Sequence, residues 1–186
     1  KKARCKDCYK CLRACPVKAI EVTNHQAKII DDRCILCGTC TIVCPQNAKI
    51  VHSELDNIKE LLKSNKKVIA TVAPSAISSF QLKDFSIIKI ALGKLGFYDA
   101  EETAIGAQLV TREYAKLMKT GKFKNFIVSS CPAICKMIQM YYPKALKYLA
   151  PVDSPMIAHA KLLKKQNPEA KIVFIGPCIA KKREAA

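Results

Sequence analysis

The sequence predicts an α+β unit over residues 1–52, followed by an α/β domain with a mainly parallel sheet over residues 67–186. Three observations support this division. Eight of the 11 cysteines fall within the first 44 residues, in two copies of one spacing. A polar turn flanked by apolar residues, typical of a β-hairpin, separates the two copies. From residue 67 onward, apolar strand-length segments alternate with helical segments, which is typical of a parallel sheet covered by helices.

Each cysteine run has the spacing C-x2-C-x2-C-x3-C followed by proline, and the second run repeats the first at an offset of 29 residues. This spacing holds four-iron clusters in bacterial ferredoxins. The first three cysteines of a run wrap around one cluster, whereas the fourth lies too far along the chain and binds the other. We therefore expect an α+β ferredoxin-like domain with two 4Fe-4S clusters. The expected ligands are Cys5, Cys8, Cys11 and Cys44 for cluster 1, and Cys34, Cys37, Cys40 and Cys15 for cluster 2.

Zinc and disulfide bonds are the alternatives for so many cysteines. A zinc ribbon uses two CxxC pairs separated by a longer loop rather than two sets of four. Disulfide frameworks suit small secreted chains, and the sequence shows no signal-peptide pattern. No apolar run approaches the roughly 20 residues that a membrane-spanning helix needs. We therefore expect a cytoplasmic protein with no membrane partner.

The formal net charge of +17 is spread over the whole chain. Aromatic residues are few and no tight basic run occurs, so lysine-rich solvated helix faces are favoured over a nucleic-acid surface. We expect no nucleic-acid partner. An excess of positive charge attracts acidic proteins, and a redox partner protein, such as a ferredoxin, is the partner that we expect.

Secondary structure follows from the apolar pattern. A hairpin is expected over residues 20–30, with His25 in its turn, and a matching strand over residues 48–51. Residues 53–66 are expected to form a linker helix that begins near Ser53. In the α/β domain we expect strands over 67–73, 97–100, 126–129 and 171–175, and helices over 84–95, 103–119, 155–166 and after Pro132.

Two later cysteines occupy equivalent places. Cys131 and Cys178 each follow a predicted strand and begin a helix. Strand ends of an open parallel sheet gather at one crevice, and a helix N-terminus stabilises a thiolate. The two could therefore meet at one metal centre, although two ordinary buried cysteines would give the same pattern. Cys135 is interpreted as a buried cysteine and His159 as a packing or surface residue.

Around these cysteines the sequence resembles the iron-only (FeFe) hydrogenases. Residues 129–133 (S-S-C-P-A) resemble their T-S-C-C-P-x-W loop, and residues 176–182 (G-P-C-I-A-K-K) resemble their M-P-C-x-x-K-K loop. The resemblance covers nearly the whole chain. It implies that Cys131 and Cys178 are two of the four ligands to the four-iron part of an H-cluster. It also implies that Lys181 contacts the di-iron part.

Several positions depart from the family pattern. Ser130 stands where the resemblance places a proton-relay cysteine, and the tryptophan and methionine of the two loops are replaced. The downstream relay positions fall on Tyr114, Leu117 and Ala150. A third loop, which supplies the last two cluster cysteines in the family, is absent, so we expect a domain that is incomplete at its C-terminus. Proton transfer needs groups within hydrogen-bond reach, and these losses point to a divergent, sensory member.

We therefore expect a hydrogenase-like iron–sulfur electron-transfer protein, whose full-length form is a redox or hydrogen sensor containing an H-cluster. A catalytic hydrogenase that uses ferredoxin electrons is one alternative. The other alternative is a plain two-cluster electron carrier whose α/β part is a docking domain.

Overall fold

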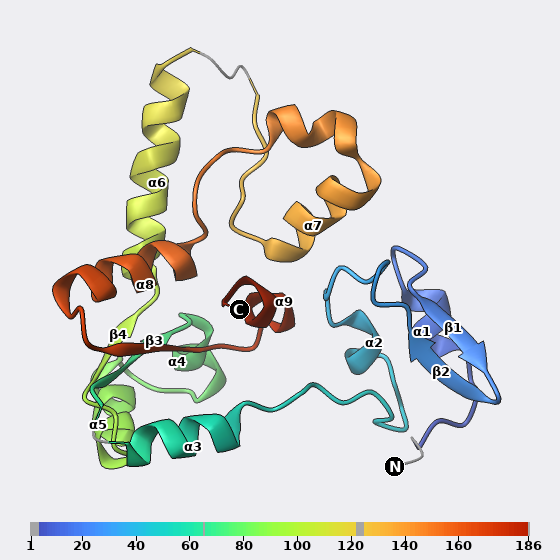
Figure 1. Cartoon of the computed structure of the whole chain (residues 1–186), viewed down its shortest axis with the longest axis horizontal. Helices are drawn as coiled ribbons and strands as arrows, with labels where there is room; N and C mark the ends of the chain where they lie inside the picture. The colour runs from blue at the N-terminus through green and yellow to red at the C-terminus, as the bar shows by residue number, and fades with distance from the viewer. Residues whose placement is uncertain (1–3, 65, 122–124, 186) are drawn as a thin grey trace.

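The computed structural model describes residues 4–64, 66–121 and 125–185. An N-terminal unit with a two-stranded antiparallel sheet is followed by a larger part with a three-stranded parallel sheet. Figure 1 shows the N-terminal unit at one side of the molecule and the parallel sheet at the other, with helix α9 between the sheet and helix α2.

The N-terminal unit is built around a short hairpin. Its turn residues, Asn24 and His25, have φ of 49° and 56°, which is the left-handed conformation that a two-residue hairpin turn requires. His25 Nδ1 lies 2.9 Å from Asp7 Oδ2. The predicted hairpin is therefore confirmed. The elements of this unit are α1 (Lys10–Ala14), β1 (Ile20–Thr23), β2 (Gln26–Ile29) and α2 (Thr39–Ile42).

The strand predicted over residues 48–51 is wrong. This segment has no regular secondary structure, and Ile50 is 90% exposed. The first repeat can pair β1 with β2 because a hairpin follows its last cysteine. The second repeat leads instead to helix α3 (Leu55–Lys63), so its apolar segment has no strand to pair with.

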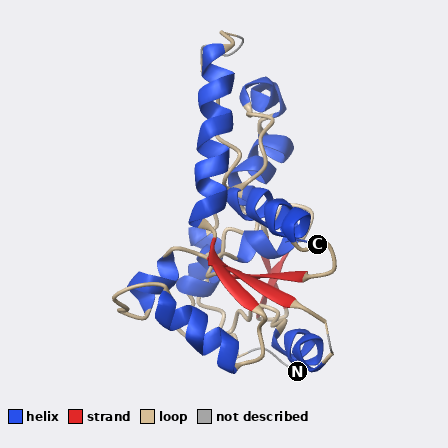
Figure 2. Ribbon diagram, turned by 90° about the vertical axis from the view of Figure 1, so that its left-hand side faces the viewer, coloured by secondary structure: helices blue, strands red, loops and turns tan. Residues whose placement is uncertain are grey.

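The parallel sheet has the order β4-β3-β5, with β3 (Val68–Val72) in the centre. Strand β4 (Asp99–Glu102) and strand β5 (Lys171–Ile175) both run parallel to β3 (Figure 2). Every residue of β3 is buried, as expected for a strand that is covered on both faces. The predicted α/β class with a parallel sheet is confirmed.

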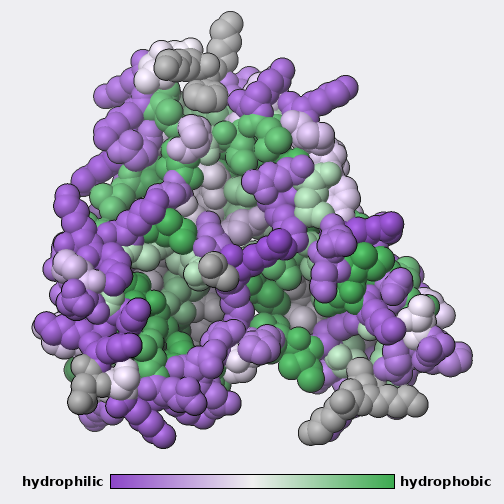
Figure 3. Space-filling view, in the orientation of Figure 1, coloured by the Kyte–Doolittle hydropathy of each residue, from purple (hydrophilic) through white to green (hydrophobic). Residues whose placement is uncertain are grey.

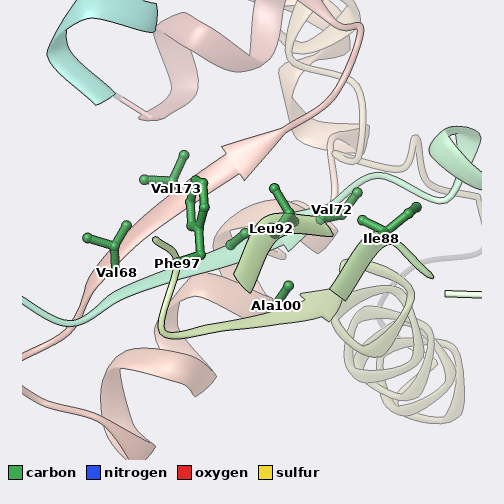
Figure 4. Close-up of a cluster of buried hydrophobic side chains, with 8 residues drawn as sticks. Val68, Val72, Ile88, Leu92, Phe97, Ala100 and Val173 are labelled. Atoms are coloured by element: carbon green, nitrogen blue, oxygen red, sulfur yellow. The ribbon is translucent and has the colours of Figure 1, made fainter. Parts of the chain in front are cut away.

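Helices cover both faces of this sheet. On one face, Ile88 and Leu92 of helix α5 (Ser86–Lys94) pack with Val68, Val72 and Phe97 (Figure 4). Three partly buried residues of α3 join this cluster, namely Ile58, Leu61 and Leu62. The helix predicted as a linker is therefore also part of the core of the α/β part.

The opposite face is covered by helix α8 (Pro155–Gln166), whose Leu163 packs on Ile69. Helix α6 (Ala104–Lys119) lies against α8. A Cβ at Gly106 would lie only 2.0 Å from the carbonyl oxygen of Pro155, so glycine is required where these helices meet. The remaining helical elements are α4 (Ser75–Ser79), α7 (Pro132–Tyr141), η1 (Pro143–Tyr148) and α9 (Ile179–Ala185).

The strand predicted over residues 126–129 is also wrong. Ile127 forms only an isolated parallel bridge with Leu149, through hydrogen bonds to Tyr148 O and from Ala150 N. The next backbone donor on this side, Ser129 N, bonds to the Tyr114 hydroxyl oxygen, so the ladder stops there. Cys131 consequently follows an irregular segment and not a strand of the sheet.

Hydrophilic side chains are spread over the face shown in Figure 3, with smaller hydrophobic patches between them. Across the described ranges, no helix has the length and apolar character needed to cross a membrane.

Candidate metal centres

Two small cavities in the N-terminal unit are each lined by four cysteines. The first, site 1, is lined by Cys5, Cys8, Cys11 and Cys44. Three of these side chains come from the first cysteine run and one from the second. The fold therefore brings the fourth cysteine of the second run to the loop of the first.

The second cavity, site 2, has the reciprocal arrangement. Cys34, Cys37 and Cys40 of the second run line it together with Cys15 of the first. The two runs thus exchange their fourth cysteines, and each cavity receives the four thiols that the sequence predicts for one cluster.

The two cysteine loops also share an unusual backbone conformation. Three pairs of residues at the repeat offset of 29 all have left-handed φ angles. Left-handed residues next to right-handed ones can turn backbone N–H groups towards a common concave side, which favours an anion. A four-iron cluster bound to four thiolates is such an anion. The pairs are Asp7 and Leu36, Tyr9 and Gly38, and Lys18 and Asn47.

Backbone N–H groups donate directly to three of the cysteine sulfurs. The N–H of Ala19 lies 3.2 Å from Cys15 Sγ, and the N–H of Ala48 lies 3.3 Å from Cys44 Sγ. These two bonds occupy equivalent places in the repeat. Leu36 N donates to Cys34 Sγ at 3.4 Å. Hydrogen bonds to sulfur favour the thiolate and stabilise a bound cluster.

The pKa directions of two cysteines follow their surroundings. The N–H of Ala48 is the largest cause that lowers the pKa of Cys44, and nearby Lys49 acts in the same direction. Burial raises the pKa of Cys40, although Lys49 opposes this effect. Lys49 therefore lies within electrostatic range of one cysteine from each cavity.

Within the part of the chain that the structure describes, no three Cys, His, Asp or Glu side chains are close enough to hold one metal ion. A four-iron cluster does not require that closeness, because each of its thiolates binds a different iron. The two four-thiol cavities, the N–H donors to sulfur and the concave loops fit such a cluster.

Cys131 and Cys178 are both exposed and stand at the starts of α7 and α9. The loops that precede these helices lie together, because Lys181 Nζ donates to the carbonyl oxygen of Ser130 at 3.1 Å. Lys181 also donates to Glu184 Oε2 at 2.7 Å. The loop positions that the sequence singles out therefore meet at one place in the fold.

A second polar contact lies beside these loops. Ser129 N donates to the phenol oxygen of Tyr114 at 3.0 Å, and the Tyr114 hydroxyl lies 3.1 Å from Ser129 Oγ. Leu117 and Ala150 have no side-chain proton to transfer, and Ala150 is buried. Glu184, which the sequence analysis did not single out, accepts hydrogen bonds from Lys181 and from the buried Ser154.

The N-terminal unit meets the α/β part at the loop of site 2. Gly38, next to Cys37, packs against Ile179, next to Cys178. Lys136 Nζ of α7 donates to the carbonyl oxygen of Cys34 at 2.6 Å.

Further contacts hold the same interface. The Tyr141 hydroxyl donates to Arg33 O at 2.7 Å, and Lys182 Nζ donates to His52 O at 2.6 Å. A cleft of about 520 Å³ lies between α7, α9 and the loop that contains Ile35. Site 2 therefore faces the loops of Cys131 and Cys178.

Cys135 and His159 lie outside these sites. Cys135 is half-buried rather than buried, and its Sγ donates to Ser129 O at 3.4 Å. His159 is a packing residue, as predicted. It is fully buried between Thr71 Oγ1, 2.7 Å from its Nδ1, and Glu101 Oε2, 3.2 Å from its Nε2.

Site 1 and site 2, joined to a parallel-sheet domain, define a hydrogenase-like iron–sulfur electron-transfer protein. Residues 66–186 match the family of the iron-only hydrogenase large subunit, C-terminal domain, and residues 4–48 match the 4Fe-4S dicluster domain. The chain belongs to the iron-only (FeFe) hydrogenase family.

Two curated proteins show the likeness in sequence. The NADP-reducing hydrogenase subunit HndD of Solidesulfovibrio fructosivorans is 26% identical over 195 residues, covering 90% of this chain and 33% of that protein. A subunit of the ion-translocating oxidoreductase complex of Methanosarcina acetivorans is 46% identical over 44 residues, covering 24% of this chain and 17% of that protein. The chain thus spans about a third or less of the length of these relatives.

Solved structures of FeFe hydrogenases share the fold. One, from work on oxygen inactivation through the 2Fe subcluster of the H cluster, has a TM-score of 0.56 and 21% identity. The match covers 72% of this chain and 41% of the chain in that structure. Another, of HydA(deltaEFG) from work on stepwise H-cluster assembly, has a TM-score of 0.56, 22% identity and similar coverage.

Proposed function

We propose that this chain holds two 4Fe-4S clusters and passes single electrons between a redox partner protein and a centre at Cys131 and Cys178. Site 1 would hold one cluster and site 2 the other. In the full-length protein, the centre would be an H-cluster that senses hydrogen or redox state. The proposed domains are 1–52 for the two clusters, 53–66 for the linker helix and 67–186 for the hydrogenase-like part.

The observation that supports two clusters most strongly is the exchange of the fourth cysteine between the runs. A single four-iron cluster needs four thiolates, and each cavity is lined by four. When bound, each cluster supplies one-electron oxidation and reduction. The chain supplies thiolates, N–H donors to sulfur and a largely closed environment.

The contact between Gly38 and Ile179 supports the proposed electron route. Their neighbours Cys37 and Cys178 are both exposed, so ligands of two different centres approach each other across this interface. Electrons would then pass between site 2 and the centre of the α/β part. Cys131 and Cys178 would supply two of the thiolates of that centre, and Lys181 would lie beside it.

The replaced relay positions support sensing over fast turnover. Ser130 has a hydroxyl group in place of a thiol, so it cannot supply a thiolate as a proton acceptor. Its carbonyl oxygen accepts a hydrogen bond from Lys181. Tyr114 is held by Ser129, and the other two downstream relay positions are Leu117 and Ala150. A rapid proton path through these four positions has no acid or base at two of them, Leu117 and Ala150.

The test of two clusters is anaerobic reconstitution, followed by iron analysis and electron paramagnetic resonance (EPR) of the reduced protein. About eight iron atoms per chain are expected from two cubanes, and more if the α/β centre is loaded. A colourless protein that binds no iron would contradict the proposal. Eight iron atoms with no further centre in the full-length protein would support the plain carrier instead.

One observation favours the catalytic alternative. Ser154, Glu184 and Lys181 form a hydrogen-bonded chain that ends at the carbonyl oxygen of Ser130. This chain offers a different set of proton-transferring groups beside the same loops. A hydrogen-evolution assay of the full-length protein separates the two functions, since high turnover would contradict the sensory proposal.

A further inference from the structure

We propose that the cluster of site 1 is more easily reduced than the cluster of site 2, so that electrons move outward, from the α/β part through site 2 to site 1. This inference rests on the proposed function, because it requires both clusters. The evidence is a comparison of the two halves of the internal repeat, which share left-handed residues at three equivalent places but have different side chains around the cysteines.

Two pairs of residues break the symmetry of the repeat. Gln46 stands at the place of Val17, and Lys49 stands at the place of Ile20, each at the offset of 29. Like the fourth cysteine of each run, all four line the cavity of the other repeat, with Gln46 and Lys49 at site 1 and Val17 and Ile20 at site 2. In both pairs, the polar or charged residue lies at site 1 and the apolar residue lies at site 2.

Lys49 brings a cation to site 1. Its side chain is half-buried, and its Nζ donates to the carbonyl oxygen of Ala27 at 2.5 Å. Ala27 itself lines the same cavity, so the ammonium group is held at the cavity wall. The corresponding Ile20 is buried, with 7% of its surface exposed, and presents only carbon to site 2.

Gln46 brings an amide to the same cavity. Its Oε1 lies 3.6 Å from Cys8 Sγ and 3.9 Å from Cys44 Sγ. Thiols can donate to this oxygen, but iron-bound thiolates only accept. Rotation of the amide would then present its NH2 group, which has two donors, to the two sulfurs. Val17 can make no such bond at site 2.

The remaining charges at site 1 do not cancel this effect. Lys10 and Asp7 also line the cavity, and Asp7 Oδ2 lies 2.9 Å from His25 Nδ1. The lining of site 1 therefore contains two lysines against one carboxylate, which has a partner. Among the described residues, no charged side chain lines site 2.

One further cation approaches site 2 from outside its cavity. Lys136 Nζ contacts the carbonyl oxygen of Cys34, as described above. Three carboxylates line the same interface cleft as Lys136, from Asp31, Asp32 and Glu184. These carboxylates oppose the charges of Lys136 and of Arg183, which lines the same cleft, whereas Lys49 has only Asp7 to oppose it within its own cavity.

The direction of the difference follows from electrostatics. An oxidised cubane with four thiolates has a charge of about −2, and one added electron makes it about −3. A nearby cation stabilises the added charge. Hydrogen-bonding groups contact sulfur at both sites, with Ala48 N–H at site 1 and with Ala19 N–H, Leu36 N–H and the Thr39 hydroxyl at site 2, so the expected order rests on the cation. Transfer of one electron from a reduced cluster held at site 2 to an oxidised cluster held at site 1 would therefore be favoured. No bond is broken, and no proton is needed. The electron donor is the reduced centre of the α/β part, and the final acceptor is an oxidised partner protein.

The test is a redox titration of the reconstituted protein, followed by EPR. Cys11→Ser and Cys40→Ser variants identify the signals of site 1 and site 2 by their loss. In the unsubstituted chain, the signal of site 1 is expected at the higher potential. Lys49→Met, which keeps the length of the side chain, should lower the potential of site 1 by more than that of site 2, whose Cys40 also lies within electrostatic range of Lys49. Gln46→Val should lower the potential of site 1 and leave site 2 unchanged.

Matched variants complete the design. Lys49→Arg keeps the positive charge and should leave the potential of site 1 close to that of the unsubstituted chain. Lys28→Met, which removes an exposed lysine of β2, should change the potential of neither site. Val17→Gln should raise the potential of site 2. The inference is overturned if two intact cubanes show the opposite order, or if Lys49→Met shifts both sites equally or neither. A protein with fewer than two cubanes would instead overturn the proposed function.

Discussion

Gly38 and Ile179 are in such close contact that a Cβ added to Gly38 would lie 2.9 Å from Cδ1 of Ile179. Gly38 also has φ of 81°, which an L side chain rarely adopts. This one pair joins the loop of site 2 to the start of α9. It explains why a glycine stands in the second cysteine run where Tyr9 stands in the first.

Gly38→Ala should therefore destabilise the protein, by about 1–2 kcal/mol, mainly through the strained φ. The terminal methyl group of Ile179 can move aside, so steric overlap is the smaller cost. Chemical denaturation of the apo protein measures the change. Gly93→Ala is the matched control, since a Cβ there meets nothing within 4 Å inside α5. It should be neutral or stabilising by about 0.5–1 kcal/mol. Equal effects of the two substitutions would contradict this account.

Cys11→Ser should remove the cluster of site 1 and leave the EPR signal of site 2 visible. The reason is that Cys11 lines only the first cavity, although it belongs to the same run as Cys15 of the second. Iron content should fall by about half. Cys135→Ser is the control and should keep both signals, because Cys135 lines neither cavity. Full retention of both clusters by Cys11→Ser would refute the ligand assignment.

Thr71→Val should cost about 1–3 kcal/mol of folding free energy, because it leaves buried polar partners unsatisfied. The hydroxyl of Thr71 lies 2.7 Å from His159 Nδ1 and 2.8 Å from Thr103 Oγ1, inside the core between β3 and α8. Urea denaturation measures the change. Thr111→Val on the exposed side of α6 removes only a bond to its own helix, and it should change stability by a few tenths of a kcal/mol. If Thr71→Val lost as little folding free energy as Thr111→Val, the network around Thr71 would contribute nothing measurable to stability.

Asp84 should contribute a pH-dependent term to stability. Hydrogen bonds from the hydroxyl and the N–H of Ser86 lower the pKa of Asp84 in the folded chain. A lowered pKa means that its contribution is present above the ordinary value of about 4 and is lost as the pH falls through the folded value. Asp84→Asn keeps a side-chain oxygen for the Ser86 N–H but cannot ionise. The thermal unfolding of this variant should therefore depend less steeply on pH between about pH 5 and pH 3. Identical pH profiles would contradict the assignment.

The spacing of the cysteines was sufficient to predict which of them would line each cavity, because the chemistry of a cubane dictates that spacing. The hairpin and strands β3 and β5 were predictable from local apolar patterns and turn residues. The prediction of a strand over residues 126–129 was wrong because it rested only on the local apolar pattern. An apolar segment has the same local pattern whether it joins a sheet or makes a single bridge to Leu149.

The interface could not be predicted from local pattern. The contacts of Gly38 with Ile179 and of Lys136 with the Cys34 carbonyl join residues more than 100 positions apart. In contrast, the roles of Gln46 and Lys49 left a signal in the sequence. A comparison of the two repeats at the offset of 29 would have found both substitutions, because each replaces an apolar residue of the other copy.

The hydrogen bonds from Lys136, Tyr141 and Lys182 to backbone carbonyl groups of residues 33–52 fasten the N-terminal unit to α7 and α9. The spacing between the proposed redox centres on the two sides is therefore set by the fold and does not depend on diffusion. Electron exchange within the chain should then proceed at the same rate in dilute buffer and in concentrated glycerol, whereas exchange with a separate protein should slow as viscosity rises.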